Sequence, residues 1–540
     1  MDSSTPSDLT NATASTHLLP RFSTYAVFTG CFVIYLLGLA IYRLYLTPSA
    51  KFPGPRLAAL CYWYEFYYDV WPHEGQYTWK IRDLHEKYGP FVRINPCEVH
   101  CNDPDFFNTL YVSSAKRTTD KWIWAVRQSW TRNSSFKTLS HDLHKRRRNQ
   151  VAPFFSKSSI RRLEPLIINK VNKLCERLEA KSQLDTASNK VVNLTHAFMA
   201  LTGDVISTVC FGQPTGFLDL EDLGRDWYEG RVVGSRSNHL LRQFPWLFLL
   251  PLGWISGGKS RVAASLQYAQ QKQKELRERV TQLVDEHDAK TADEKLPAEP
   301  QDNSLPATVF VSMLEADVPP SEKNASRLTE EAFTLTGAGT MTTANALNSI
   351  VYYVLSRPDC LARLKDELRA AFPDPSAISS SAELERLPVS PFEDYSYSRP
   401  DGHVEIIPHG VPVGMSFIDI LEDEEIFPDP HAFKPERWLP AVLPRDQTRD
   451  EEEETADDPV ARRRKWAVST VFGGGSRMCI GLHLAWSEMY LTVATLVSRF
   501  GDRMELYDVE FERDIKVAID GFDAFPGRGH KGLRVTMLPE

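Results

Sequence analysis

The sequence predicts a mainly α-helical protein with a small β region, preceded by one N-terminal transmembrane helix. An uncharged apolar stretch near the N-terminus predicts the membrane helix. Long stretches with helical spacing of apolar residues fill the middle of the chain, and short alternating stretches typical of strands lie to either side. Hydrophobic residues make up 42% of the 540 residues and charged residues 25%, which is usual for a globular body with a sizeable core.

The N-terminal stretch comprises residues 24–42 and is long enough to cross a bilayer, which takes roughly 20 apolar residues. Basic residues are more frequent after it than before it: Arg43, Lys51 and Arg56 against Arg21. The positive-inside rule therefore places residues 1–23 in the lumen of the endoplasmic reticulum and the body in the cytoplasm. A cleaved signal peptide is the alternative, but this apolar stretch is long and follows a polar tail.

Residues 43–60 are predicted to form a proline-rich hinge. Two prolines around a glycine, Pro53-Gly54-Pro55, favour a stiff non-helical connector that would set how the body meets the membrane. Asn11 lies in an Asn-Ala-Thr triplet and is a candidate glycosylation acceptor in the lumenal tail, although such triplets often occur by chance.

The body, residues 61–540, contains no domain-sized linker and no internal repeat, so we expect one large domain. Its first strand is predicted at residues 91–94. An acidic insertion is predicted at 445–458, because its run of like charges is typical of a solvated segment. Three long helices are predicted, the last of them apolar and therefore central: 159–181, 265–287 and 328–355.

Charge and cysteine content exclude several classes of protein. The net charge of −9 gives no reason to expect a nucleic-acid partner. The eight cysteines are scattered over a long chain, unlike a small disulfide scaffold. Cys97 and Cys101 flank His100, which raises zinc as an alternative, but no second pair follows at zinc spacing. Two reduced thiols in a strand-rich segment are the simpler interpretation.

The strongest chemical signal is the segment 472–481, Phe-Gly-Gly-Gly-Ser-Arg-Met-Cys-Ile-Gly. Its glycines permit close backbone approach and positive φ. Cys479 precedes a predicted helix at 482–497, and the N-terminus of a helix favours thiolate over thiol. Arg477 can pair with a carboxylate of a ligand, and Phe472 can shield the sulfur. A glycine-rich turn with an inert buried cysteine is the alternative.

This segment resembles the haem-binding signature of the cytochrome P-450 superfamily, F-x-x-G-x-R-x-C-x-G. All five positions match: Phe472, Gly475, Arg477, Cys479 and Gly481. The resemblance implies a cytochrome P-450 fold and a haem-thiolate monooxygenase domain in residues 61–540. It further implies haem b as cofactor, with Cys479 as the axial thiolate ligand.

Two further segments resemble parts of the same family. His144 and Arg148 occupy positions where the family holds the haem propionates, although a basic surface helix is the alternative. Ala338, Gly339 and Thr342 resemble the oxygen-activation motif. The resemblance implies that Gly339 lets the helix open beside the iron and that Thr342 hydrogen-bonds dioxygen or a water. Alternatively, Thr342 bonds back to its own helix.

The sequence departs from the family in two places. Met341 stands where an acidic residue is usual, and methionine cannot relay a proton. We also expect the E-x-x-R helix to be lost near 388–389, because Glu383-Leu-Glu-Arg386 matches the letters but lies too early. Its loss would leave Arg437 without its buried partners, which costs on the order of 3–5 kcal/mol.

The resemblance implies a membrane-bound oxidoreductase that inserts one atom of O2 into an apolar small molecule. Electrons would come from NADPH through an NADPH-cytochrome reductase, and the general likeness is to ascomycete secondary-metabolism enzymes, including terpenoid oxygenases. Candidate basic docking residues are Lys145 to Arg148, Arg161, Arg162 and Arg462 to Lys465, for which a solvated helix face is the alternative. Aromatic residues expected near the substrate are Trp122, Trp124, Trp130, Phe136, Phe522 and Phe525.

Two other functions remain open from the sequence. Met341 raises a haem isomerase or dehydratase on the same scaffold, and the missing helix raises an inactive remnant or an incomplete gene product. Oxygen uptake that depends on NADPH would argue against the first, and a thiolate-type spectrum would eliminate the second.

Overall fold

The computed structural model describes residues 18–112, 117–127, 131–184, 190–249, 261–293, 308–384, 407–408, 410–438 and 459–540. The predictions made for Asn11, for residues 388–389 and for the insertion 445–458 lie outside the described residues. The chain divides into two compact units. One comprises Met1–Glu65, Asp83–Cys101 and His403–Gly414, and the other comprises Phe66–Arg82, Asn102–Gly402 and Met415–Glu540.

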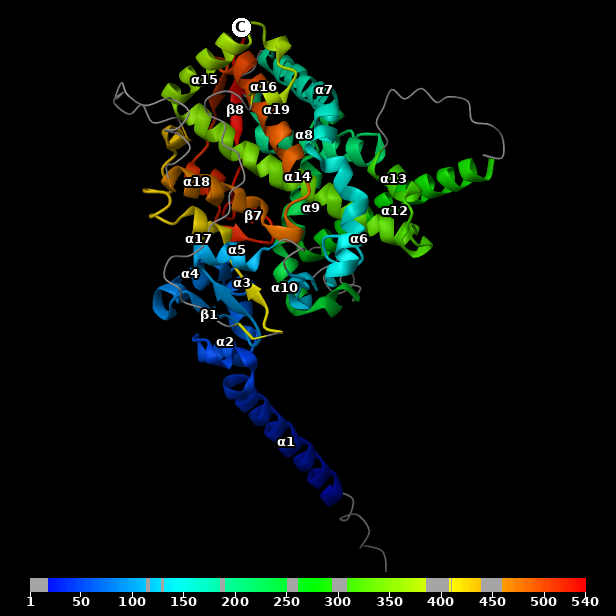
Figure 1. Ribbon diagram of the computed structural model, residues 1–540, viewed down its shortest axis with the longest axis vertical. Helices are drawn as coiled ribbons and strands as arrows, with labels where there is room; N and C mark the ends of the chain where they lie inside the picture. Colours follow the sequence, from blue (N-terminus) through cyan, green and yellow to red (C-terminus); the bar gives the residue numbers. More distant parts are fainter. Residues whose placement is uncertain are drawn as a thin grey trace, which may run out of the picture. The chain divides into compact units, whose positions relative to one another are not determined.

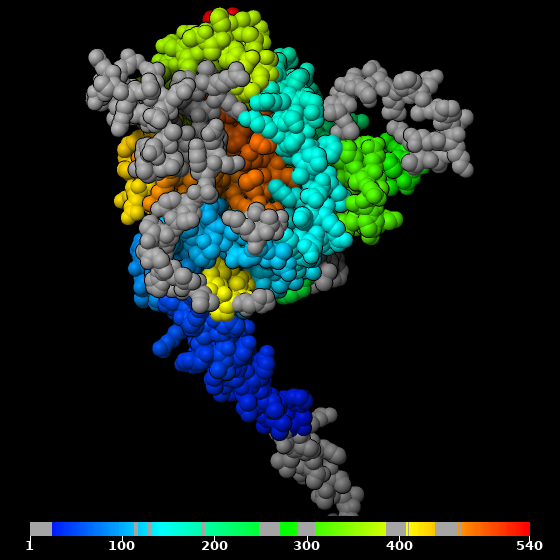
Figure 2. Space-filling model, viewed as in Figure 1, coloured from blue at the N-terminus to red at the C-terminus, as the bar shows by residue number. Residues whose placement is uncertain are grey.

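The first unit begins with α1 (Leu18–Ile41), which continues into a π-helical turn at Tyr42–Leu46. The stretch Thr24–Leu46 has a mean hydropathy of 2.0 and none of it is buried, so it is a candidate membrane span as predicted. Its large apolar side chains are exposed, and Figure 2 shows this segment uncovered on the face in view. The short α2 (Arg56–Leu60) lies within the predicted hinge 43–60, directly after Pro53-Gly54-Pro55.

A three-stranded sheet completes this unit, with strand order β1-β2-β4. β1 (Phe91–Arg93) pairs antiparallel with β2 (Val99–Cys101), which pairs parallel with β4 (Val413–Gly414). The Pro53 carbonyl accepts a hydrogen bond from the Arg93 N–H at 2.7 Å. A Cβ on Gly54 would lie 2.3 Å from the Arg93 carbonyl oxygen, so this close approach requires glycine.

The second unit contains most of the helices. Two short helices, α3 and α4, run across the boundary between the units. These two boundary helices and the described helices of the second unit are α3 (Trp63–Asp69), α4 (Tyr77–Tyr88), α5 (Phe107–Leu110), α6 (His141–Val151), α7 (Lys157–Ser182), α8 (Leu194–Phe211), α9 (Arg225–Arg236), α10 (Asn238–Gln243), α12 (Arg261–Asp293), α13 (Val309–Glu315), α14 (Ala325–Ser356), α15 (Pro358–Ala371), α16 (Ser381–Leu384), α17 (Phe417–Leu421), α18 (Pro459–Ser469) and α19 (Leu482–Phe500).

The centre of this unit is α14, which packs against α8, α12 and α19 (Figure 1). α14 and α7 begin a few residues before the predicted starts because polar residues cap them. The Asn324 side chain accepts from the Arg327 N–H, and the Ser156 side chain accepts from the Ser159 N–H. α8 is apolar enough to span a membrane, but 89% of it is buried, so it is a core helix.

Two small sheets lie near the C-terminus of the chain. β8 (Arg534–Met537) is central in the order β3-β8-β5, pairing antiparallel with β3 (Val191–Asn193) and β5 (Met504–Leu506). β6 (Ile519–Asp520) and β7 (Ala524–Phe525) form a hairpin. The mainly helical fold with small β regions is therefore confirmed.

Candidate active site

The loop before α19 has the backbone that its glycines predict. Gly473 and Gly475 have φ values of +73° and +63°, in the region that favours glycine. A Cβ on Gly475 would lie 2.4 Å from the Val112 carbonyl oxygen, so this position has no room for a side chain. The Cys479 N–H donates to the Phe472 carbonyl at 2.7 Å, which closes the loop beneath the sulfur.

Cys479 lies two residues after Arg477 and two before Gly481, the residue that precedes α19. Although the residue counts as exposed, the surrounding protein desolvates its sulfur and raises the pKa of the thiol. The Gly481 N–H and the charge of Arg148 act in the opposite direction. The hydrogen bond from the Gly481 N–H, just before the helix, therefore favours the thiolate, but desolvation outweighs it.

Four basic side chains surround this loop and form what we call the cation cluster: His144, Arg148, Arg477 and Lys121. His144 is buried on α6, and burial, followed by Arg477 and Arg148, lowers its pKa to about 3. Burial, Arg477 and Lys137 lower the pKa of Lys121 to about 7. The members of the cluster therefore repel one another.

Arg477 is held by backbone acceptors rather than by a carboxylate. Its guanidinium donates to the carbonyls of Thr138 and Leu139 at 3.0 and 2.9 Å. Burial lowers its pKa, Asp120 opposes that shift and Arg148 adds to it. Among the described residues, neither Arg477 Nε nor His144 Nδ1 has a hydrogen-bond partner, although both atoms are buried. Buried donors without acceptors indicate an anionic ligand.

The site therefore combines a cysteine sulfur, a glycine-lined loop and a group of cations that lack paired carboxylates. This set of groups fits a haem, which requires an axial ligand for its iron and hydrogen-bond donors for its two propionates. Cys479 would hold the iron, and Arg477, His144 and Arg148 would hold the propionates. Phe472 packs near Trp486, with ring centroids 6.0 Å apart, beside the same loop.

Along α14, Ala338 and Thr342 are exposed on one face, and the Thr342 hydroxyl donates to the Ala338 carbonyl at 2.8 Å. This is the back-bonding that the sequence left open as an alternative. A Cβ on Gly339 would lie 2.7 Å from Ile206 Cγ1, so this glycine allows α14 and α8 to pack closely. Met341 is fully buried in the hydrophobic core and does not share the exposed face of Thr342.

Aromatic residues from two distant segments meet near this face. Phe136 and Phe522 lie edge to face, with ring centroids 6.2 Å apart and an interplanar angle of 76°. Asn345, one turn after Thr342, donates to the Ala524 carbonyl at 3.0 Å and so ties α14 to the hairpin that carries Phe522. Lys121 Nζ lies 3.8 Å from the centroid of the Phe136 ring, which connects this pair to the cation cluster.

Sequence reasoning missed two residues here. Lys121 belongs to no recognisable pattern, and its position becomes visible only through contacts with Phe136 and Arg477. Glu488 is almost fully buried on α19, and burial raises its pKa well above the usual range, while the Thr343 hydroxyl opposes the shift. An acidic residue within the apolar stretch 482–497 was the available signal.

Arg437 differs from the prediction. Its guanidinium donates to the carbonyls of Pro428 and Asp429 at 2.8 and 2.6 Å, and the residue is partly exposed. The expected cost of an uncompensated buried charge is therefore not incurred, because backbone oxygens and solvent satisfy the guanidinium. Glu383 is exposed on α16, and Arg386 lies outside the described residues.

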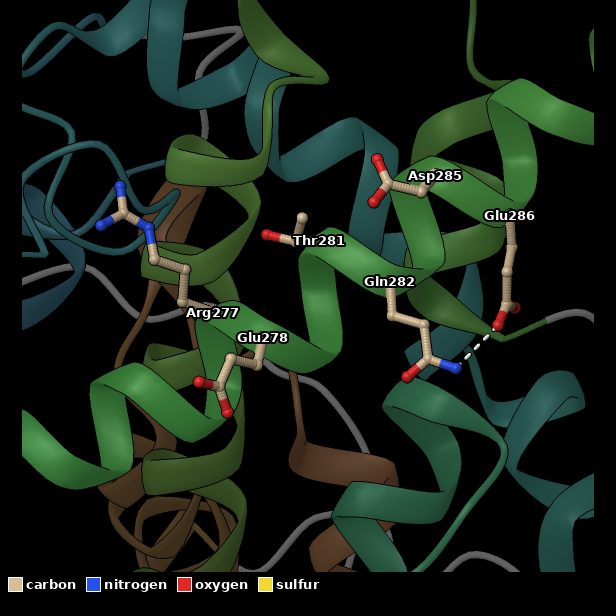
Figure 3. A pocket seen from close by; sticks show the side chains of 6 residues that line it. All are labelled: Arg277, Glu278, Thr281, Gln282, Asp285 and Glu286. Atoms are coloured by element: carbon tan, nitrogen blue, oxygen red, sulfur yellow. Dashed lines mark hydrogen bonds between the residues drawn. The ribbon is translucent and has the colours of Figure 1, made fainter.

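A hollow elsewhere on the surface is not an alternative candidate for the active site. It runs along α12 and is lined by residues of that single helix: Arg277, Glu278, Thr281, Gln282, Asp285 and Glu286 (Figure 3). Gln282 Nε2 donates to Glu286 Oε1 at 2.8 Å along the same helix. None of the residues predicted to carry chemistry lines it.

The fold and the cysteine site together define a haem-thiolate protein. The chain belongs to the cytochrome P450 family, whose model matches residues 53–390 and 401–512. It is 38% identical to a tryptophan 6-hydroxylase of Fusarium equiseti, over 94% of this chain and 95% of that protein. It is 36% identical to an N-acetyltryptophan 6-hydroxylase of Emericella nidulans, over 97% and 99% of the two chains. It is 32% identical to a stellatic acid synthase of Emericella variicolor, over 96% and 95%.

These comparisons fix the general activity. Relatives matched over nearly their whole length include cytochrome P450 monooxygenases of fungi, so the chain is an oxidoreductase of the haem monooxygenase type. They give no support to a haem isomerase, a dehydratase or an inactive remnant.

Proposed function

We propose that this chain is a monooxygenase of fungal secondary metabolism, anchored in the endoplasmic reticulum membrane, that oxidises an apolar, ring-bearing small molecule. The observation that carries the proposal is the position of Cys479 beside cations that lack paired carboxylates. The bound haem supplies dioxygen activation, which the thiolate promotes by donating electron density.

The residues of the chain divide the remaining tasks. Cys479 would ligate the iron, and the 472–481 loop, closed by the hydrogen bond from the Cys479 N–H to the Phe472 carbonyl, would hold the sulfur in place. Arg477 and Arg148 would neutralise the propionates, and the imidazole of His144, whose pKa of about 3 leaves it neutral, would donate a hydrogen bond to one of them. Thr342 presents its hydroxyl oxygen on the exposed face of α14, where this oxygen can accept a hydrogen bond from a water because the Ala338 carbonyl already accepts its own hydrogen. Met341 lies in the core and contributes packing.

Phe136 and Phe522 support a substrate with an apolar ring. Both side chains are exposed and present an edge-to-face pair next to the tether between Asn345 and Ala524. The names of the relatives include hydroxylases of tryptophan and N-acetyltryptophan, which favours testing indole compounds beside terpenoid acids. NADPH would act through a membrane-bound reductase, for which the exposed Lys145 and Arg146 of α6 are candidate contacts, whereas Arg147 is buried against Glu322.

The loss of an E-x-x-R helix remains part of the proposal. The family match is interrupted between residues 390 and 401. The alignment to the Fusarium relative is 529 positions long, although it covers only 94% of the 540 residues of this chain. The alignment is therefore longer than the part of this chain that it contains, so some residues of the relative are aligned to gaps in this chain. The first observation places a break in the family match next to residues 388–389, and the second shows that this chain has gaps relative to that protein without locating them. Sequencing the transcript across the codons for Pro388 and Val389 tests the proposed loss, and a continuous transcript without a helix-coding exon would contradict it.

The activity is tested with full-length protein and a reductase in vesicles. We expect a thiolate-type Soret band in the reduced carbon-monoxide difference spectrum, and NADPH-dependent oxygen uptake when the correct substrate is present. Thr342→Ala should keep the spectrum but divert electrons from product to peroxide. Equal coupling in the variant and the wild type would remove Thr342 from the mechanism.

A further inference from the structure

Two adjacent carboxylates near the start of α14 hold a loop that precedes α6. Glu330 accepts from the Asn133 backbone N–H at 2.6 Å and from Asn133 Nδ2 at 2.9 Å. Glu331 accepts from the Ser135 backbone N–H at 2.8 Å and from Ser135 Oγ at 2.6 Å. Four hydrogen bonds to carboxylates therefore fix two residues, Asn133 and Ser135, of what we call the Phe136 loop, residues 131–138. Bonds of this kind are about twice as strong as neutral ones.

The carboxylates are themselves buried and held in place. Glu331 has no exposed surface, and Arg327 NH1 lies 2.7 Å from its Oε2. Arg327 also donates to Glu322 at 3.2 Å, and Glu322 accepts from Arg147 of α6 at 2.8 Å. The Phe136 loop is therefore connected through α14 to the helix that carries His144 and Arg148.

Within this loop, Phe136 projects outwards while its neighbours point inwards. Ser134 and Ser135 on one side and Lys137 and Thr138 on the other are 0%, 9%, 8% and 3% exposed, whereas Phe136 is 45% exposed. Thr138 closes the loop by donating its N–H and its hydroxyl to the Ser134 carbonyl, at 3.1 and 2.7 Å. The backbone at both ends of Phe136 is thus fixed, and its ring is directed towards Phe522.

We propose that Glu330 and Glu331 are specificity-determining positioning residues that act through Phe136. Neither carboxylate contacts a reacting group. Each holds the backbone on the N-terminal side of Phe136, so that the aromatic pair offers a fixed surface to a ring-bearing substrate. The inference rests on the proposed monooxygenase function and adds to it the residues of α14 that set which substrates bind.

The test compares two iron-binding probes on full-length haem-loaded protein. Both probes bind iron through an imidazole nitrogen. Imidazole itself is small, whereas clotrimazole is an imidazole that also carries a carbon bearing three aryl rings. Glu330→Gln and Glu331→Gln should each raise the dissociation constant of clotrimazole about tenfold, which corresponds to about 1.4 kcal/mol of binding free energy. The dissociation constant of imidazole should change by less than about twofold. Glu278→Gln, an exposed acid on α12, serves as the matched control and should change neither dissociation constant.

A double-mutant cycle separates positioning from general stability. Phe136→Ala alone should weaken the binding of clotrimazole. Adding Glu331→Gln to this variant should not weaken clotrimazole binding further, because the carboxylate acts through the Phe136 ring. Ser135→Ala removes one of the two bonds to Glu331 without altering α14, and it should shift clotrimazole in the same direction by a smaller factor.

Three outcomes would overturn the inference. Equal weakening of both probes, additive losses in the cycle, or unchanged clotrimazole binding in the glutamine variants would each show that the carboxylates do not act through Phe136. A wild-type protein that binds neither probe at iron would instead contradict the proposed function, so the two failures are distinguishable.

Discussion

One helix, α6, borders two groups of buried charge that differ in composition. Arg147 belongs to what we call the paired-charge network, in which Arg147 and Arg327 meet Glu322 and Glu331. His144 and Arg148, on the same helix, belong to the cation cluster: burial lowers the pKa of both, and the charges of Arg477 and Arg148 lower the pKa of His144 further. Each arginine of the first group lies within 3.2 Å of a carboxylate oxygen, whereas among the described residues no member of the second group forms such an ion pair.

The difference separates residues that stabilise the fold from residues that await a ligand. A buried ion pair with good geometry needs nothing further, and removing one partner leaves a costly charge behind. A group of like charges costs free energy in the apoprotein and becomes favourable when an anion enters. The cation cluster therefore marks a place where the apoprotein is less stable than it could be because its residues are arranged to bind an anion.

Cys479→Ala has the largest expected effect and tests the ligand side of the comparison. We expect complete loss of the thiolate-type Soret band, because Cys479 is the only cysteine in the 472–481 loop and the thioether of Met478 cannot form a thiolate. The reduced carbon-monoxide difference spectrum measures this. Met478→Ala, which changes the neighbouring exposed residue, is the control and should keep the band. An unchanged spectrum in Cys479→Ala would refute the ligand assignment.

Arg327→Met tests the paired-charge network. It leaves Glu331 buried without its cation, which should destabilise the protein by about 3–5 kcal/mol. The free energy of unfolding from urea titrations measures the loss. Arg225→Met is the control: it breaks an exposed ion pair with Glu229, which is worth about 0–1 kcal/mol. Similar losses in the two variants would remove the contrast between buried and exposed pairs.

Arg148→Leu and Arg147→Leu, neighbours on α6, should separate the two groups directly. Arg148→Leu relieves repulsion among the cations, so the apoprotein should keep its stability. Haem should dissociate faster, because the variant loses one charge-assisted hydrogen bond, which contributes about 1.5–3 kcal/mol to the free energy of haem binding. Arg147→Leu should instead lower the stability of the apoprotein, because it deprives Glu322 of a partner. Transfer of haem to an acceptor protein and urea titration measure the two effects. The same profile in both variants would contradict the distinction.

Local signals in the sequence predicted the parts of the site that are contiguous in the chain. The glycine pattern around Cys479 specifies its own backbone through positive φ at Gly473 and Gly475. The apolar pattern predicted α14 to within a few residues. The spacing of His144 and Arg148 predicted one helical face, and the structure places them beside Arg477.

The remaining parts depend on contacts between distant segments, which local patterns do not encode. Glu330 and Asn133 lie 197 positions apart, and Lys121 meets Arg477 from a segment with no periodicity. Met341 was interpreted from its position in a motif, whereas its burial depends on how α14 packs. Arg437 obtains its acceptors from a nearby loop whose carbonyl directions no residue pattern specifies.

The smallest expected effect is a pH dependence contributed by Lys121. Its pKa is about 7 in the folded apoprotein, because of burial and then Arg477 and Lys137, and the ordinary value of 10.5 applies to the unfolded chain. Between these values the unfolded chain binds more protons, so this group makes the apoprotein more stable as pH rises from about 7 to about 10. Lys121→Met should flatten that slope in urea midpoints measured at pH 7 and pH 9. Lys145→Met, another basic residue bordering the same loop on α6 but exposed, should leave the slope unchanged. If the slope persisted in Lys121→Met, Lys121 would not be under repulsion, and the cation cluster would lose the member that connects it to Phe136.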